Sequence, residues 1–134
     1  MSDLYQAALL DHAKHPRNFG PLPGADREAA AANPLCGDEL TLRLRIASGR
    51  IAAIAFEGQG CAICLASASM MTAVTKGGSE SDARDWMRRV EALVRGEGDS
   101  ADLGDLAALG GVARYPSRAA CALLAWNALA SALG

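Results

Sequence analysis

The strongest constraint on the fold of this 134-residue chain is a single β-hairpin pattern, which lies between segments of helical pattern. Thr41–Ile46 alternates apolar and polar side chains strictly, which is typical of a strand with one buried face. Ser48-Gly49-Arg50 provides a turn, and the nearly all-apolar Ile51–Phe56 predicts a second strand that lies centrally in the sheet. A third strand is expected within residues 26–33, paired to an edge of this hairpin.

Helical patterns occupy most of the remaining chain. The predicted helices are one that Ser2 caps and Pro16 ends, one over Cys64–Lys76, one that Ser79 or Ser81 caps and Gly96 ends, a short one over Leu103–Leu109, and one from Ser117 to about Leu133. This order of helix, strands and helices predicts an α+β fold, with a small antiparallel sheet of about three strands and helices packed mainly on one face. The length predicts a single domain over residues 1–134.

Charge and hydropathy narrow the classes of function. Thirteen Lys and Arg against fifteen Asp and Glu give a formal net charge of −2, which argues against a nucleic-acid partner. The longest nearly apolar stretch, Ala119–Leu133, is too short to span a bilayer, so no membrane partner is expected. Met1-Ser2-Asp3 lacks the basic start of a signal peptide, which predicts a cytoplasmic protein. In that compartment the four cysteines indicate metal or thiol chemistry before disulfides.

Three of the cysteines stand at junctions between predicted elements. Cys36 lies in a turn before the hairpin, and Cys61 lies between the hairpin and a helix. Cys121 lies in the first turn of the last helix if Ser117 caps that helix. Because helix N-termini stabilise thiolates, we expect low thiol pKa values for both Cys61 and Cys121. Together with the carboxylate of Asp38, these thiolates are a donor set for a tetrahedral zinc site, although their spacing matches no local zinc motif. The alternative is that each cysteine is a small buried residue.

The segment Cys61-Ala62-Ile63-Cys64 allows further interpretations. A CxxC at a strand–helix junction is the motif of thiol–disulfide oxidoreductases, although the parallel βαβ pattern that accompanies it is missing. A zinc ribbon is excluded because the chain has no second CxxC. Cys64 by itself is expected to be a small buried residue. A structural zinc module that only mediates protein contacts is a third hypothesis.

Two histidines and two tryptophans complete the candidates. His12 and His15 lie about one turn apart on the first predicted helix, and a surface or capping role is expected for them rather than metal binding. Trp86 and Trp126 stand at helical positions that favour the core.

Five segments in order carry a resemblance to a known family. They are Asp11-His12 with His15-Pro16-Arg17-Asn18, Asn33-Pro34-Leu35-Cys36-Gly37-Asp38, Phe56-Glu57-Gly58-Gln59-Gly60-Cys61, Ala66-Ser67-Ala68-Ser69-Met70-Met71, and Tyr115-Pro116-Ser117-Arg118-Ala119-Ala120-Cys121. From about Leu4 to Leu133 the chain resembles the U-type iron–sulfur cluster assembly proteins, which comprise IscU, SufU and the NifU N-terminal domain. It looks most similar to the SufU branch, because the stretch between Cys61 and Cys121 is long and Ala120 replaces the histidine of IscU-type proteins.

This resemblance implies a function and a site. It implies that Cys36, Asp38, Cys61 and Cys121 bind zinc, and that the protein accepts persulfide sulfur from a SufS-like cysteine desulfurase. For scaffold members it implies a transient [2Fe-2S] cluster on the same three cysteines, destined for apo iron–sulfur proteins or other assembly factors. Such a protein is a scaffold or a sulfur acceptor. If it is an enzyme at all, the resemblance implies a zinc-dependent sulfurtransferase. Cys36 is the expected sulfur acceptor, since its turn allows it to leave the metal with the least disruption.

Overall fold

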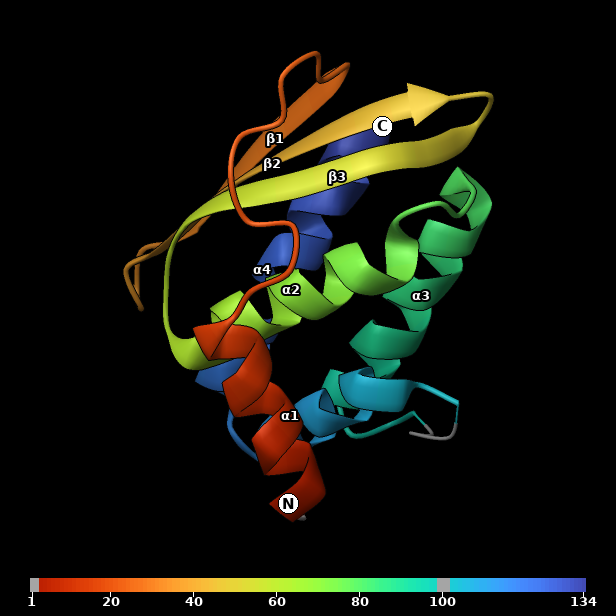
Figure 1. Cartoon of the computed structure of the whole chain (residues 1–134). Coiled ribbons are helices and arrows are strands. Elements are labelled where there is room, and N and C mark those ends of the chain that lie inside the picture. The colour runs from red at the N-terminus through yellow and green to blue at the C-terminus, as the bar shows by residue number, and fades with distance from the viewer. Residues whose placement is uncertain (1–2, 99–101) are drawn as a thin grey trace.

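Three antiparallel strands and five helical segments make up the chain in a computed structural model, which describes residues 3–98 and 102–134 (Figure 1). In chain order the elements are α1 (Asp3–Lys14), β1 (Arg27–Asn33), β2 (Asp38–Ala47), β3 (Arg50–Gln59), α2 (Ala62–Thr75), α3 (Glu80–Val94), the 3-10 helix η1 (Gly104–Arg114) and α4 (Pro116–Leu133). The predicted α+β class and the third strand within residues 26–33 are confirmed.

The central strand of the sheet is β2, which pairs with β1 on one side and β3 on the other. The prediction that Ile51–Phe56 lies centrally is therefore wrong. The loop after α1 follows the outer edge of β3 and helps to bury it, which explains why this edge strand is nearly all apolar. There the backbone N–H of Phe56 donates to Asn18 O at 3.0 Å, and Gly20 N–H donates to Phe56 O at 2.9 Å. Phe19 packs edge-on against Phe56, with the ring centroids 5.2 Å apart, so part of this edge is covered.

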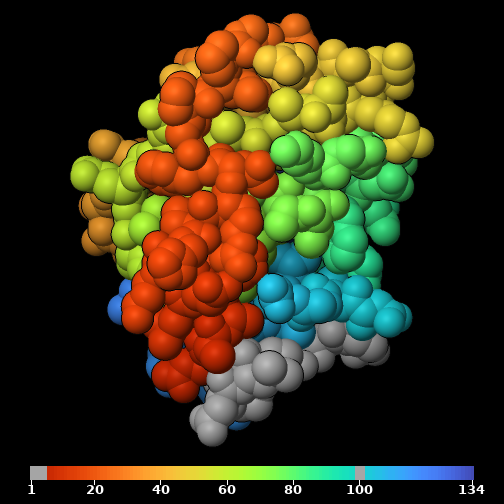
Figure 2. All heavy atoms as spheres, viewed as in Figure 1, coloured from red at the N-terminus to blue at the C-terminus, as the bar shows by residue number. Residues whose placement is uncertain are grey.

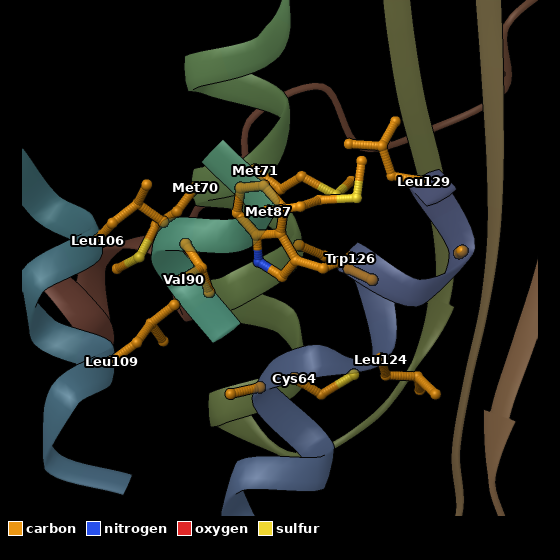
Figure 3. Close-up of a cluster of buried hydrophobic side chains, with 14 of the residues drawn as sticks. Cys64, Met70, Met71, Met87, Val90, Leu106, Leu109, Leu124, Trp126 and Leu129 are labelled. Atoms are coloured by element: carbon orange, nitrogen blue, oxygen red, sulfur yellow. The ribbon is translucent and has the colours of Figure 1, made fainter. Parts of the chain in front are cut away.

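The helices lie on one face of the sheet, as predicted (Figure 1). α4 packs against β1 and β2, while α2 packs against both α1 and α4. Leu42 and Leu44 of β2, Met71 of α2, and Trp126 and Leu129 of α4 are each at most 1% exposed. Figure 3 shows the indole of Trp126 among side chains of α2 and α3 in this core. Within the described ranges, no helix has the length and apolar character needed to cross a membrane.

Local signals explain where α3 and α4 begin, whereas Ser2, the predicted cap of the first helix, lies outside the described residues. Ser79, one of the two predicted caps, caps α3. Its hydroxyl accepts a hydrogen bond from the Asp82 N–H at 3.0 Å, and the Asp82 carboxylate accepts one from the Ser79 N–H. The prediction that Ser117 caps the last helix is wrong. α4 begins at Pro116, because proline lacks an N–H and has a helical φ, which suits the first position of a helix. The short helix predicted over Leu103–Leu109 is a 3-10 helix that continues to Arg114.

Candidate metal centre

Three segments that are distant in sequence bring thiol and carboxylate groups together at one end of the sheet. The turn between β1 and β2 carries Cys36 and Asp38, Cys61 is the N-cap residue of α2, and Cys121 lies in α4. Among the described residues, the ligand atoms of Cys36, Asp38 and Cys121 all lie within 4.8 Å of one another, and this group does not include Cys61. The sulfur atoms of Cys36 and Cys121 are 3.3 Å apart, although 85 positions separate these residues in the chain. Such separations suit donors that share one metal ion through bonds of roughly 2.0–2.3 Å.

The β1–β2 turn holds Cys36 outward and Asp38 inward. Asn33 pairs with Asp38 across the turn, and the Cys36 N–H donates to Asn33 O at 3.1 Å. Gly37 has a φ of +71°, a left-handed conformation that glycine adopts without a steric penalty. Cys36 is exposed as a result, whereas Asp38 is fully buried. This turn projects from the left side of the molecule in Figures 1 and 2, where a partner can reach it.

Asp38 organises the site through its two carboxylate oxygens. Its Oδ1 accepts a hydrogen bond from the Cys61 backbone N–H at 2.9 Å, which ties the start of α2 to the start of β2. Its Oδ2 is buried and has no hydrogen-bond partner among the residues that the structure describes. A buried carboxylate oxygen without a partner is costly, so it calls for a proton or a cation. The free oxygen and the neighbouring thiols together fit a divalent metal.

Cys121 lies in the second turn of α4 and is 1% exposed. Burial raises the pKa of its thiol, and the proximity of Asp38 and of the neighbouring thiols raises it further. The prediction of a low pKa at Cys121 is therefore wrong. Because α4 begins at Pro116 rather than after Ser117, the thiol lies beyond the first turn, where the effect of the helix dipole fades. A coordinated cation would act in the opposite direction, since a metal-bound thiol loses its proton.

The surroundings of Cys61 and Cys64 argue against a redox-active pair. All four cysteines are free thiols, and Cys61 is half-buried, close enough to Cys121 to affect the pKa of that thiol. Cys64 is fully buried, and burial followed by the charge of Asp38 raises the pKa of its thiol to about 12. A thiol of this kind is a poor nucleophile, which argues against the oxidoreductase hypothesis. Cys64 is the small buried residue that was expected, and Figure 3 shows it within the hydrophobic cluster.

Gly60 is needed where the site and the core meet. A Cβ atom at this position would lie 2.9 Å from Asp38 Oδ1 and 3.0 Å from Cys64 Sγ. Only a residue without a side chain allows the backbone to pass this close to both groups.

His12 has a role that sequence reasoning missed. It is 4% exposed, not a surface residue, and its Nδ1 lies 2.7 Å from Ser69 Oγ while its Nε2 lies 3.1 Å from Asp105 Oδ2. The Arg17 N–H also donates to Ser69 Oγ, at 2.8 Å. His12 thus joins α1 to α2 and η1. His15, by contrast, is exposed, as expected.

Ser67 is a second buried residue that the sequence did not single out for a role. Its hydroxyl donates to Ala122 O at 2.6 Å and accepts from Trp126 Nε1–H at 3.1 Å. The one available signal was the presence of two serines, Ser67 and Ser69, in the otherwise apolar stretch of residues 62–71 in α2. Both serines are fully buried. Ser67 contacts α4, whereas Ser69 contacts His12 of α1.

The sequence and the fold match known proteins. Residues 4–122 match the family described as the NifU-like N terminal domain. The chain is 39% identical over 131 residues to the zinc-dependent sulfurtransferase SufU of Bacillus subtilis, which covers 96% of this chain and 88% of that protein. It is 38% identical over 135 residues to the iron-sulfur cluster assembly scaffold protein IscU of Streptococcus pyogenes, with 99% of this chain and 84% of that protein covered.

A solved structure agrees with the fold over the whole chain. It belongs to a protein of Fervidobacterium islandicum AW-1 described as an iron-sulfur cluster assembly scaffold protein for the SUF system. The two structures superpose with a TM-score of 0.90 at 32% sequence identity, covering 100% of this chain and 96% of the other. The match therefore includes the β1–β2 turn with Cys36, the start of α2 with Cys61 and the start of α4 with Cys121.

Proposed function

This chain belongs to the NifU-like N-terminal family, which includes IscU and SufU, and we propose that it accepts persulfide sulfur from a cysteine desulfurase during iron–sulfur cluster assembly. In this proposal zinc is held by Cys36, Asp38, Cys61 and Cys121. The SufU and IscU relatives are almost equally similar, at 39% and 38% identity, so overall identity does not choose between their roles. Ala120, in place of the histidine of IscU-type proteins, favours the SufU-like role.

The single observation that carries the proposal is the buried Oδ2 of Asp38, which has no partner among the described residues and lies beside the Cys36 and Cys121 thiols. Cysteine thiolates and aspartate oxygen both bind zinc, so three thiolates and one carboxylate provide the four donors of a tetrahedral site. Zinc would keep the thiols deprotonated and would protect them from oxidation until they are needed. Asp38 would be its weakest protein ligand, because a carboxylate oxygen is a harder donor than a thiolate.

Exposure supports Cys36 as the sulfur acceptor. Cys36 is exposed on a turn, whereas Cys121 is buried and Cys61 is fixed at the start of α2 by the bond to Asp38. In the transfer, the Cys36 thiolate attacks the outer sulfur of a desulfurase cysteine persulfide. A new S–S bond forms on Cys36, the S–S bond of the donor breaks, and the desulfurase cysteine leaves as a thiolate. The exchange needs no outside oxidant or reductant.

The surface around the site supports a protein partner. Leu35, next to Cys36, is 92% exposed, and Tyr115, at the start of α4, is 60% exposed. A groove of about 340 Å³ beside Cys61 is lined by Ala62, Ile63, Gly111, Val112, Tyr115 and Arg118. Exposed apolar side chains that lie together with an apolar groove mark interaction sites. In this proposal they form part of the surface on which a partner protein docks to bring its cysteine to Cys36.

A scaffold role is the second candidate, because the same three cysteines are available to hold iron. In that role Cys36, Cys61 and Cys121 would ligate a [2Fe-2S] cluster, which is cargo for apo iron–sulfur proteins. Fe–S clusters are held by cysteine thiolates, and the close approach of Cys36 and Cys121 is compatible with this as well. Aerobically purified protein that carries zinc and no iron would favour the sulfur-acceptor role.

The sulfur-acceptor proposal is tested by locating the transferred sulfur. The purified chain is incubated with a SufS-like desulfurase and cysteine, and peptides are mapped by mass spectrometry for one added sulfur atom. We expect the sulfur on Cys36, no uptake in Cys36→Ser, and normal uptake in Cys64→Ser. Added sulfur on Cys64, with none on Cys36, would overturn the mechanism and revive the redox interpretation.

A further inference from the structure

We propose that Ser67 is a positioning residue that sets the distance between the metal-site ends of α2 and α4. This inference rests on the proposed metal site, because it concerns how Cys61 and Cys121 are held apart. The Ser67 hydroxyl donates to the carbonyl oxygen of Ala122, the residue directly after Cys121, at 2.6 Å. The contact therefore acts on the turn of α4 that carries a proposed ligand.

The interface between α2 and α4 needs such a contact. Small side chains, among them Ala66 and Ala68 of α2 and Ala122 and Ala125 of α4, are buried along these helices. Apolar contacts between small residues are not directional, so they leave sliding and rotation of one helix against the other poorly determined. A buried hydrogen bond is directional, and leaving its groups unpaired is unfavourable. The Ser67–Ala122 bond thus selects one register of the two helices.

A second bond makes the Ser67 contact specific. Trp126, one turn after Ala122 on α4, donates its indole N–H to Ser67 Oγ at 3.1 Å. Trp126 is 1% exposed, so the indole N–H depends on this acceptor within the protein. The hydroxyl of Ser67 therefore bridges two successive turns of α4. At the other end of the site, the bond from Cys61 N–H to Asp38 fixes the start of α2 to the sheet.

Ser69 offers a matched control on the same helix. Ser67 and Ser69 are both fully buried and both use their hydroxyls in hydrogen bonds to other elements. Ser69, however, contacts His12 and Arg17, not α4. Loss of either hydroxyl should lower thermal stability, but only loss of the Ser67 hydroxyl should change the metal centre.

The test uses cobalt(II) as the probe, because thiolate-bound cobalt(II) has a visible spectrum that reports its coordination geometry. Cobalt affinity and spectrum are measured by titration against a competing chelator, for the full chain and its variants. We expect Ser67→Ala to weaken cobalt binding about tenfold and to alter the visible bands, as substitutions in groups that orient metal ligands do. Ser69→Ala should retain the affinity and the spectrum of the unmodified chain.

Four outcomes overturn the inference, and they are distinguishable. Unchanged affinity and spectrum in Ser67→Ala, or equal losses in Ser67→Ala and Ser69→Ala, would refute positioning by Ser67 alone. Absence of thiolate–cobalt bands in the unmodified chain would refute the proposed metal site as well. If Ser67→Ala does not fold, the double variant Ser67→Ala/Trp126→Phe removes the hydroxyl together with the stranded indole donor. The same loss of affinity is expected there, and normal binding would refute the inference.

Discussion

The Asp38 carboxylate accepts a hydrogen bond of 2.9 Å from the Cys61 backbone N–H, so the first residue of β2 positions the residue that begins α2. The other oxygen of the same carboxylate is buried without a partner among the described residues. One side chain thus serves the fold through Oδ1 and is available to a ligand through Oδ2. This division suggests that the structural and metal-binding roles of Asp38 can be separated by substitution.

Asp38→Asn should speed zinc release while the fold is retained. The amide preserves an oxygen that can accept from Cys61, but it lacks the negative charge that attracts zinc. We expect release to a colorimetric chelator to accelerate by about tenfold or more. Glu39→Gln, at the next and exposed position of β2, is the matched control and should release zinc at the normal rate. Equal rates in Asp38→Asn and the unmodified chain would show that Asp38 is not a ligand.

Zinc should stabilise the fold because its proposed ligands come from three separate segments. A metal that binds the folded chain and not the unfolded one raises the unfolding temperature by mass action. We expect calorimetry to show a clear fall of several degrees when a strong chelator removes zinc. Cys121→Ser should already melt at the lower temperature, and chelator should have little further effect on it. A melting temperature indifferent to chelator would contradict a metal bridging these segments.

Stability at high pH should depend on Cys64. Burial, and then the charge of Asp38, raises the pKa of this thiol to about 12 in the folded chain, whereas an unfolded thiol titrates near pH 8.5. The folded state keeps a proton that the unfolded state has released, so this stabilisation is complete below about pH 8.5 and is lost as the pH rises toward 12. The unfolding free energy should therefore fall less steeply with rising pH in Cys64→Ala than in the unmodified chain, and the two slopes should differ by at most about 1.4 kcal/mol per pH unit. Urea unfolding of both chains at several pH values between about 8 and 10 measures this difference in unfolding free energy. Identical pH profiles for Cys64→Ala and the unmodified chain would contradict the prediction.

His12→Ala should destabilise the protein, whereas His15→Ala should not. Removing His12 breaks its buried contact with Ser69 and its contact with Asp105, and it opens space beneath α1, which we expect to cost about 2–3 kcal/mol. His15 is exposed, so its replacement should change the unfolding free energy by less than about 0.5 kcal/mol. Chemical denaturation of the two variants makes the comparison. Equal, small effects would show that the contacts of His12 contribute little.

Features that depend on neighbours in sequence were predictable. The hairpin over Thr41–Phe56 follows from alternation around a glycine turn, and α3 follows from its spacing of apolar residues and the Ser79 cap. The choice of β2 rather than β3 as the central strand was not predictable in this way. It depends on where β1 and the loop at Phe19 dock, and no local pattern records that.

By itself, the sequence determined which chemical groups the protein has and which of them stand at the ends of secondary-structure elements. The family resemblance and the candidate ligands Cys36, Asp38, Cys61 and Cys121 could be read from it, because motifs and turn residues act locally. Only the tertiary structure decided how far apart those groups lie and what surrounds them. The 3.3 Å approach of Cys36 and Cys121 and the unpartnered oxygen of Asp38 are examples. The physical reason is that solvent exclusion and side-chain contacts arise only when distant segments pack together, and these set both the pKa of a thiol and the need of a carboxylate for a partner.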